Sequence, residues 1–319
     1  MTPFEVALQP PDLAPWRTGN TGVPGFTRLD SGRPGPRALI VALIHGNEIA
    51  GAIALDQLLR GDIRPIRGEL TLGFANLAAL ARFDSAEPTA SRFLDEDLNR
   101  VWDNAVLDGP RRSRELDRAR EMRPLVEAAD ALLDLHSMLW PSDPLILSGP
   151  TEKGRRLASG IGIPALVVSD RGHAAGPRLI DYGPFADPRH PAAACLAECG
   201  QHWAEDTVAT TERCIAGFLR LLGMVDDARA DPICGEETAG VVPRVAEVTL
   251  AVTAATSGFT FLQPFRGGDV IARRNTLIAV DGDAEIRTPH DDCLLVMPSL
   301  RPVRGHTAVR LARFVEPDP

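Results

Sequence analysis

Apolar runs alternate with amphipathic segments through the first two thirds of the chain. Short apolar runs predict strands at residues 38–44, 69–75, 131–135, 144–148, 165–169 and 194–198. Segments with helical spacing separate them, at residues 48–60, 111–129, 151–161 and 204–222. This alternation predicts an α/β fold in which helices flank a mixed or parallel sheet.

The last third of the chain has a different pattern. The polar, acidic segment DDARADP at 226–232 is typical of a linker, and helical spacing stops after it. Residues 243–315 contain short strand candidates interrupted by Gly, Pro and Asp, a pattern that indicates an all-β unit. We therefore expect a larger α/β domain at 1–225 and a smaller C-terminal β domain at 226–319.

Composition narrows the class of protein. The chain has 319 residues, of which 44% are hydrophobic, so it can bury a full core. Its longest apolar run, Ala38 to Ile44, is far shorter than the roughly 20 residues of a membrane helix. The N-terminal residues lack the basic start and apolar stretch of a signal peptide. We expect a cytoplasmic protein with no membrane partner.

Charge and the rarer residue types exclude further classes. A formal net charge of −9 disfavours nucleic acid as a partner, because phosphate binding needs a basic surface. The five cysteines include no C-x-x-C pair, which argues against a disulfide framework or a zinc ribbon. The only lysine, Lys153, lacks the context of Schiff-base or P-loop chemistry. A small substrate is expected, and a homo-oligomer is possible.

The string His45-Gly46-Asn47-Glu48 joins the end of a predicted strand to the start of a predicted helix. An imidazole at a strand end and a carboxylate one helical turn later can bind one metal ion. Catalytic zinc commonly takes two histidines, a glutamate and a water. His136 ends another apolar run and supplies the second histidine. Taken alone, His45 would equally suit a core histidine, and Glu48 the first turn of a helix.

Two further carboxylates are expected near this site. Asp134 lies two residues before His136 on a predicted strand, so both side chains point to one face and Asp134 can orient a ligand imidazole. A cap or turn contact is the alternative for Asp134. Glu198 ends the apolar run 194–197, where it could take a proton from water at the metal. By itself, Glu198 could equally be a salt-bridge partner.

The segment RFLDEDLNR, from Arg92 to Arg100, is charged and has no strong periodicity, as is common in functional loops. Arginine presents a planar fork that suits a carboxylate or a developing oxyanion. Arg92, Asn99 and Arg100 are therefore candidates for binding an anionic substrate, and Asp97 for supporting a metal ligand. A surface salt-bridge network is the alternative, above all for Arg92.

The motifs HGNE, RFLDEDLNR, DLHS and AECGQ follow one another between about residues 38 and 222. In this order and spacing the chain resembles the succinylglutamate desuccinylase/aspartoacylase family of zinc hydrolases, relatives of the zinc carboxypeptidases. The resemblance implies a zinc carboxypeptidase-like catalytic domain followed by a β domain. It also implies these roles: one Zn²⁺ per chain on His45, Glu48 and His136, Glu198 as general base, Arg92 on the scissile carbonyl, and Asn99 with Arg100 on the substrate carboxylate.

Two departures from aspartoacylases leave the acyl-aspartate specificity open. Ala42-Leu43-Ile44 replaces a pair of glycines before His45, and the only tyrosine, Tyr182, is not in the C-terminal segment. We expect His290 to take the rim position of the missing tyrosine, with a surface-loop histidine as the alternative. Arg178 and Arg189 are candidates for a further carboxylate contact, and Arg189 is favoured because it directly precedes the strand of Glu198.

These observations predict a zinc-dependent amidohydrolase, a deacylase that cleaves the amide bond of a small, anionic N-acyl amino acid or related carboxylate-bearing compound. A zinc carboxypeptidase and a non-catalytic metal-binding protein of the same fold are the alternatives. The remaining histidines have no partner spacing and are expected to be structural or surface residues: His173, His190, His202 and His306.

Overall fold

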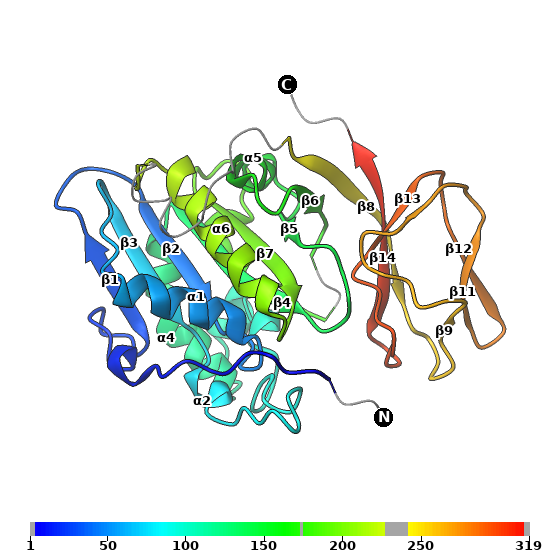
Figure 1. Ribbon diagram of the computed structural model, residues 1–319, viewed down its shortest axis with the longest axis horizontal. Helices are drawn as coiled ribbons and strands as arrows, with labels where there is room; N and C mark the ends of the chain where they lie inside the picture. The colour runs from blue at the N-terminus through cyan, green and yellow to red at the C-terminus, as the bar shows by residue number, and fades with distance from the viewer. Residues whose placement is uncertain (1–3, 173–174, 227–241, 316–319) are drawn as a thin grey trace.

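The computed structural model describes the chain at residues 4–172, 175–226 and 242–315. Its main feature is an eleven-stranded mixed sheet (Figure 1). From one edge to the other, the strands are β1 (Phe26–Asp30), β3 (Glu69–Phe74), β2 (Arg37–Ala42), β4 (Ala131–Met138), β7 (Ala193–Gln201), β5 (Leu145–Leu147), β6 (Leu166–Ser169), β8 (Arg244–Thr253), β14 (Thr307–Val315), β13 (Cys293–Val296) and β10 (Val270–Ile271).

Four neighbouring strands, β3, β2, β4 and β7, run parallel, so their C-terminal ends meet at one edge of the sheet. Every residue of β4 is buried, and β2 is buried after its first residue. Burial on both faces explains why these strands appear in the sequence as continuous apolar runs. Strand β5 pairs antiparallel with β7 and makes the sheet mixed.

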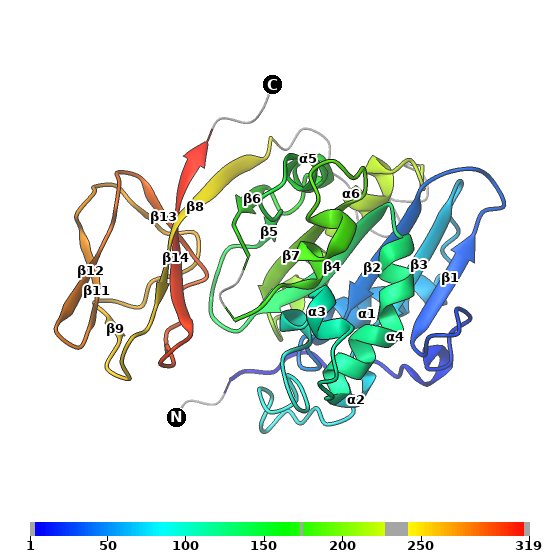
Figure 2. The same cartoon turned by 180° about the vertical axis from the view of Figure 1, so that it is seen from behind.

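Helices cover both faces of this part of the sheet. Helices α1 (Ile49–Arg60), α5 (Glu152–Ile161) and α6 (Glu205–Leu221) lie on the face seen in Figure 1. Helices α3 (Asn104–Leu107) and α4 (Arg114–Ala128) lie on the other (Figure 2). Each face has its own apolar core, one packed against α1, α5 and α6 and the other against α4. The hydroxyls of Ser113 and Thr151 accept backbone N–H groups and so cap α4 and α5.

Short helical turns complete the first part of the chain. Helix α2 (Leu77–Leu80) follows β3, and the 3₁₀ turns are η1 (Ala14–Trp16), η2 (Leu98–Arg100), η3 (Leu179–Asp181) and η4 (Gly183–Phe185). Turn η2 ends at Arg100 and is preceded by Asp97, and turn η3 is preceded by Arg178. They therefore place part of the RFLDEDLNR segment and Arg178 on the folded core.

Within residues 242–315, the regular secondary structure consists of strands without helices, as the sequence pattern predicts. Strands β8, β14, β13 and β10 extend the main sheet, because β8 pairs in parallel with β6. Strands β9 (Thr260–Phe261), β11 (Leu277–Asp281) and β12 (Ala284–Arg287) form a separate three-stranded sheet. A third apolar cluster, which includes Phe259, Phe265, Ile278 and Leu295, lies between them.

The predicted strands and helices of the first two thirds of the chain are confirmed, with ends that differ by a few residues. Strand β1 is an addition. The predicted linker at 226–232 falls, apart from Asp226, outside the described residues, and the domain boundary at 225/226 stays a prediction. No helix among residues 4–172, 175–226 and 242–315 is long and apolar enough to cross a membrane.

Candidate metal centre and active site

The HGNE motif forms a tight turn between β2 and α1. Leu43 has a positive φ of 60°, which turns the chain sharply after β2. Gly46 lies against α2, where an added Cβ would be 2.5 Å from the carbonyl carbon of Ala79. The glycine is therefore required by close packing. This turn directs His45 and Glu48 toward the C-terminal ends of the parallel strands.

The three predicted metal ligands lie together. Nδ1 of His45 is 2.7 Å from Oε1 of Glu48, and Nδ1 of His136 is 2.9 Å from Oε2. One ligand atom from each residue lies within 4.8 Å of the others, and all three side chains are buried. The group could hold a metal ion. Two imidazoles and one carboxylate form the donor set that zinc takes in many hydrolases.

Carboxylates lie against the outer nitrogen of each imidazole. Oδ1 of Asp97 is 2.9 Å from Nε2 of His45, and Oδ2 of Asp134 is 3.0 Å from Nε2 of His136. These contacts leave Nδ1 of each ring directed at the common centre, an arrangement that orients metal-ligating histidines. Asp134 is fully buried, and its carboxylate pairs with Nε2 of His136. A carboxylate buried in this way is stabilised by a positively charged imidazole or by a cation nearby.

Glu198 lies on β7 directly opposite His136 on β4, as Cα partners in register. Its side chain is buried, and Oε2 has no hydrogen-bond partner within the described chain. Burial raises the pKa of the Glu198 carboxyl to about 8, despite the opposing influence of His136 and Arg92. A carboxyl group with this pKa can exchange a proton near neutral pH.

Arg92 and Asn99 contact the metal-binding group itself. The Arg92 guanidinium lies 3.2 Å from Oε1 of Glu48 and 3.3 Å from Oδ2 of Asp97. The Asn99 Nδ2 group is 3.3 Å from Nε2 of His136, and its Oδ1 accepts the backbone N–H of Leu179. Asn99 thus lines the cavity, but its amide is already engaged with the protein.

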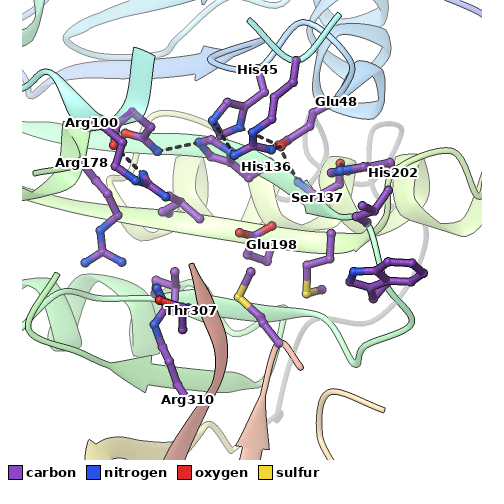
Figure 3. Close-up of a pocket in the computed structure, with 18 of the residues that line it drawn as sticks. His45, Glu48, Arg100, His136, Ser137, Arg178, Glu198, His202, Thr307 and Arg310 are labelled. Atoms are coloured by element: carbon purple, nitrogen blue, oxygen red, sulfur yellow. Dashed lines mark hydrogen bonds and ion pairs between the residues drawn. The ribbon is translucent and has the colours of Figure 1, made fainter. Parts of the chain in front are cut away.

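A cavity of about 230 Å³ opens beside these residues (Figure 3). It is lined by the predicted residues His45, Glu48, Arg92, Asn99, Arg100, His136 and Glu198. It is also lined by residues from the C-terminal strands and the loops between them: Met297, Pro298, Thr307 and Arg310. The C-terminal segment therefore forms part of the cavity wall.

Of the two arginines considered for a further carboxylate contact, the structure places Arg178 in the cavity wall and Arg189 outside it. Arg189 is 89% exposed and pairs with Asp187, two residues away. It precedes β7 and so lies at the opposite end of that strand from Glu198. Arg178 is buried in the cavity wall, where it forms ion pairs with Asp170 and Asp181.

The prediction for His290 is also not supported. His290 lines a separate hollow with Arg313 and Phe314, and its Nε2 lies 2.9 Å from the hydroxyl of Thr249. Tyr182 is buried elsewhere and donates its hydroxyl to Glu127. Neither residue therefore replaces the tyrosine of aspartoacylases at the cavity.

Sequence reasoning placed His202 among the structural histidines, but it lines the cavity. Its Nδ1 lies 2.7 Å from the hydroxyl of Ser137, which follows the candidate ligand His136. Burial lowers the pKa of His202 to about 4, so the ring is neutral at physiological pH. The local signal for His202 is its position: it directly follows β7, the strand that carries Glu198, at the edge where the other site residues lie.

Known proteins resemble this chain in sequence family and in fold. The catalytic-domain model of the succinylglutamate desuccinylase/aspartoacylase family matches residues 34–222. No curated protein matches the chain. Similar solved structures include a succinylglutamate desuccinylase/aspartoacylase from Rhodobacter sphaeroides, with 18% identity, a TM-score of 0.66 and coverage of 92% of this chain and 89% of that one.

Two further structures are similar in fold. The succinylglutamate desuccinylase from Vibrio cholerae has 16% identity and a TM-score of 0.65, with 91% of this chain and 86% of that chain covered. The ectoine utilization protein EutE (DoeB) from Ruegeria pomeroyi has 16% identity and a TM-score of 0.63, with 91% and 88% covered. Because the family model spans more than half of its residues, this chain belongs to the succinylglutamate desuccinylase/aspartoacylase family.

Proposed function

We propose that this protein is a zinc-dependent amidohydrolase that removes the acyl group from a small N-acyl amino acid or a related N-acyl compound with a free carboxylate. The observation that carries the proposal is the buried group of His45, Glu48 and His136 beside Glu198, in a cavity lined by guanidinium groups. Family membership supports the same class of reaction.

The residues present fit a zinc ion. His45 and His136 would bind it through Nδ1, and Glu48 through its carboxylate, while Asp97 and Asp134 hold the outer nitrogens. Zinc held there would polarise the amide carbonyl and lower the pKa of a water molecule. The protein's own contribution is to fix the two rings and exclude bulk solvent from them.

Two side chains carry the proposed chemistry at the amide bond. Glu198 is buried, and its Oε2 accepts no hydrogen bond from the part of the chain that the structure describes; it would accept a proton from water and deliver it to the leaving nitrogen. Arg92, whose side chain is 35% exposed, would donate to the oxygen that becomes negative in the tetrahedral state. Arg100 would hold the carboxylate of the substrate.

The two alternatives fit the cavity less well. A peptide substrate of a carboxypeptidase needs an open cleft, whereas residues 297–310 contribute four side chains to the wall of a cavity of about 230 Å³. A metal-binding protein without turnover is expected to have lost the base or a ligand. Here Glu198 and all three ligand residues are in place.

Metal analysis followed by a substrate screen tests the proposal. Purified protein is expected to contain about one zinc ion per chain, and to hydrolyse at least one member of a panel of N-acetyl, N-formyl and N-succinyl amino acids. Stoichiometric zinc with no turnover on acyl or peptidyl substrates would instead support a binding function. Release of C-terminal residues from peptides, without hydrolysis of N-acyl amino acids, would support the carboxypeptidase.

A further inference from the structure

Three of the four arginines that line the cavity are gathered on one side. Figure 3 shows Arg100, Arg178 and Arg310 on the opposite side of Glu198 from Ser137 and His202. Arg310 comes from β14, far along the chain from every motif that the sequence singles out. It lines the cavity and is only 9% exposed. The last strand thus delivers a buried charge next to the reacting groups.

The neighbouring Arg178 uses most of its N–H groups on two carboxylates. Its guanidinium donates to both oxygens of Asp170, at 3.0 and 2.6 Å, and to both oxygens of Asp181, at 2.7 and 3.0 Å. These four bonds occupy all of its N–H groups except one on Nη1, so little donor capacity remains for a ligand. Arg178 therefore serves mainly to hold Asp170 and Asp181 in the wall.

Arg310 lacks such a partner. Its nearest carboxylate is Oδ2 of Asp170, 3.6 Å from Nε, beyond hydrogen-bond distance and already bound by Arg178. Its guanidinium makes no hydrogen bond with the described residues. A buried charge without hydrogen-bonded compensation is costly, so its retention beside a reactive site indicates a binding role.

Electrostatics support this assignment. Burial and the nearby charge of Arg178 lower the pKa of the Arg310 guanidinium, although Asp170 and Glu198 oppose the effect. Burial, and then repulsion from Arg92, Arg178 and Arg310, lower the pKa of Arg100 to about 10, against the influence of Asp97. An anion bound between Arg100 and Arg310 would relieve this repulsion.

We propose that Arg310 is a specificity-determining residue that binds the anionic group of the substrate together with Arg100. This inference rests on the proposed function and deepens it. On the other side of Glu198, Figure 3 shows Ser137 and His202, whose side chains are uncharged. The substrate therefore carries its negative charge on one side of the scissile amide and an uncharged group on the other.

Kinetics of Arg310→Gln test the proposal, with Arg313→Gln as a matched control. Arg313 lies on the same strand but is exposed and faces a different hollow. With the best N-acyl amino acid, R310Q is expected to raise KM about tenfold to a hundredfold and change kcat less than threefold, the effect of losing a charge-assisted contact. With the carboxamide analogue of that substrate, R310Q and wild type should have equal KM values.

Arg310→Lys covers the case in which R310Q does not fold. Lysine keeps the charge beside Asp170 but loses the planar fork, so KM for the carboxylate substrate is expected to rise about threefold to tenfold. A KM equal to that of wild type in either folded variant overturns the proposal. So does an equal loss with the carboxylate substrate and its carboxamide analogue, which would mark Arg310 as structural.

A binding measurement separates this inference from the proposed function. Succinate and neutral succinamide are titrated calorimetrically into the metal-loaded wild-type, R310Q and R313Q proteins. Weaker succinate binding in R310Q alone supports the anion site, even if no N-acyl compound is hydrolysed and the proposed function fails. Equal succinate binding in all three proteins, together with normal hydrolysis by R310Q, refutes the role of Arg310 and leaves the proposed function intact.

Discussion

Replacing Glu198 by glutamine tests the proposed base with little change in shape. Glutamine has the same size, and Oε2 of Glu198 accepts no hydrogen bond from the described residues, so no protein contact through this atom is lost. The side chain is buried, and its residue lies opposite His136 across strands β4 and β7. We expect the variant to fold normally and to retain its metal.

The expected kinetic effect is large. A positioned general base contributes about 10²–10⁴ to the rate. At about 1.36 kcal/mol per factor of ten, the barrier should rise by roughly 2.7–5.5 kcal/mol. The loss should lie in kcat, because Glu198 moves a proton during reaction and is not needed to hold the substrate carboxylate. KM should change less than threefold.

The assay is steady-state hydrolysis of the best N-acyl substrate, with zinc measured on the same samples. Glu247→Gln is the matched control, because Glu247 is about half exposed on β8 and pairs with Arg155 outside the cavity. The control should keep wild-type activity. If Glu198→Gln holds full zinc and turns over within tenfold of wild type, Glu198 is not the base and the proton transfer must be assigned elsewhere.

Three further predictions concern the metal, the substrate and pH. In metal analysis, His136→Ala should contain no zinc, whereas the control His290→Ala should contain as much as wild type. Full zinc occupancy in His136→Ala would show that the ligand assignment is wrong. Arg92→Ala should lower kcat by about 10²–10³, whereas Arg100→Lys should mainly raise KM for substrates with a free carboxylate; the reverse pattern would exchange their roles. Burial lowers the pKa of His202 to about 4 from 6.5, so the unfolded chain binds the extra proton first as pH falls. The stability that the buried neutral ring of His202 contributes is fully present above pH 6.5, and it is lost as the pH falls from 6.5 to 4. In urea unfolding of metal-free protein, the cost of His202→Gln should therefore be smaller at pH 4.5 than at pH 7.5, and an unchanged cost would contradict a buried neutral ring.

Much of the fold and of the metal centre could be predicted from the sequence because it depends on local patterns. Strands buried on both faces appear as uninterrupted apolar runs, and amphipathic helices appear between them. Parallel strands bring their C-terminal ends to one edge, so residues at the ends of β2, β4 and β7 can be expected to meet. His45, His136 and Glu198 were found in this way, and the carboxylates Asp97 and Asp134 lie where a supporting role requires.

The tertiary structure alone decided which distant side chains complete the cavity. Arg189 is adjacent in sequence to β7 but lies at its wrong end, whereas Arg178 reaches the cavity through the turn before η3. Arg310 reaches it because β14 pairs with β8 and β8 pairs with β6. No local pattern encodes such a chain of strand pairings, since each pairing depends on long-range packing. The sequence by itself therefore determined the residues of the candidate metal centre, and the packing of the C-terminal strands determined which charges complete the cavity wall.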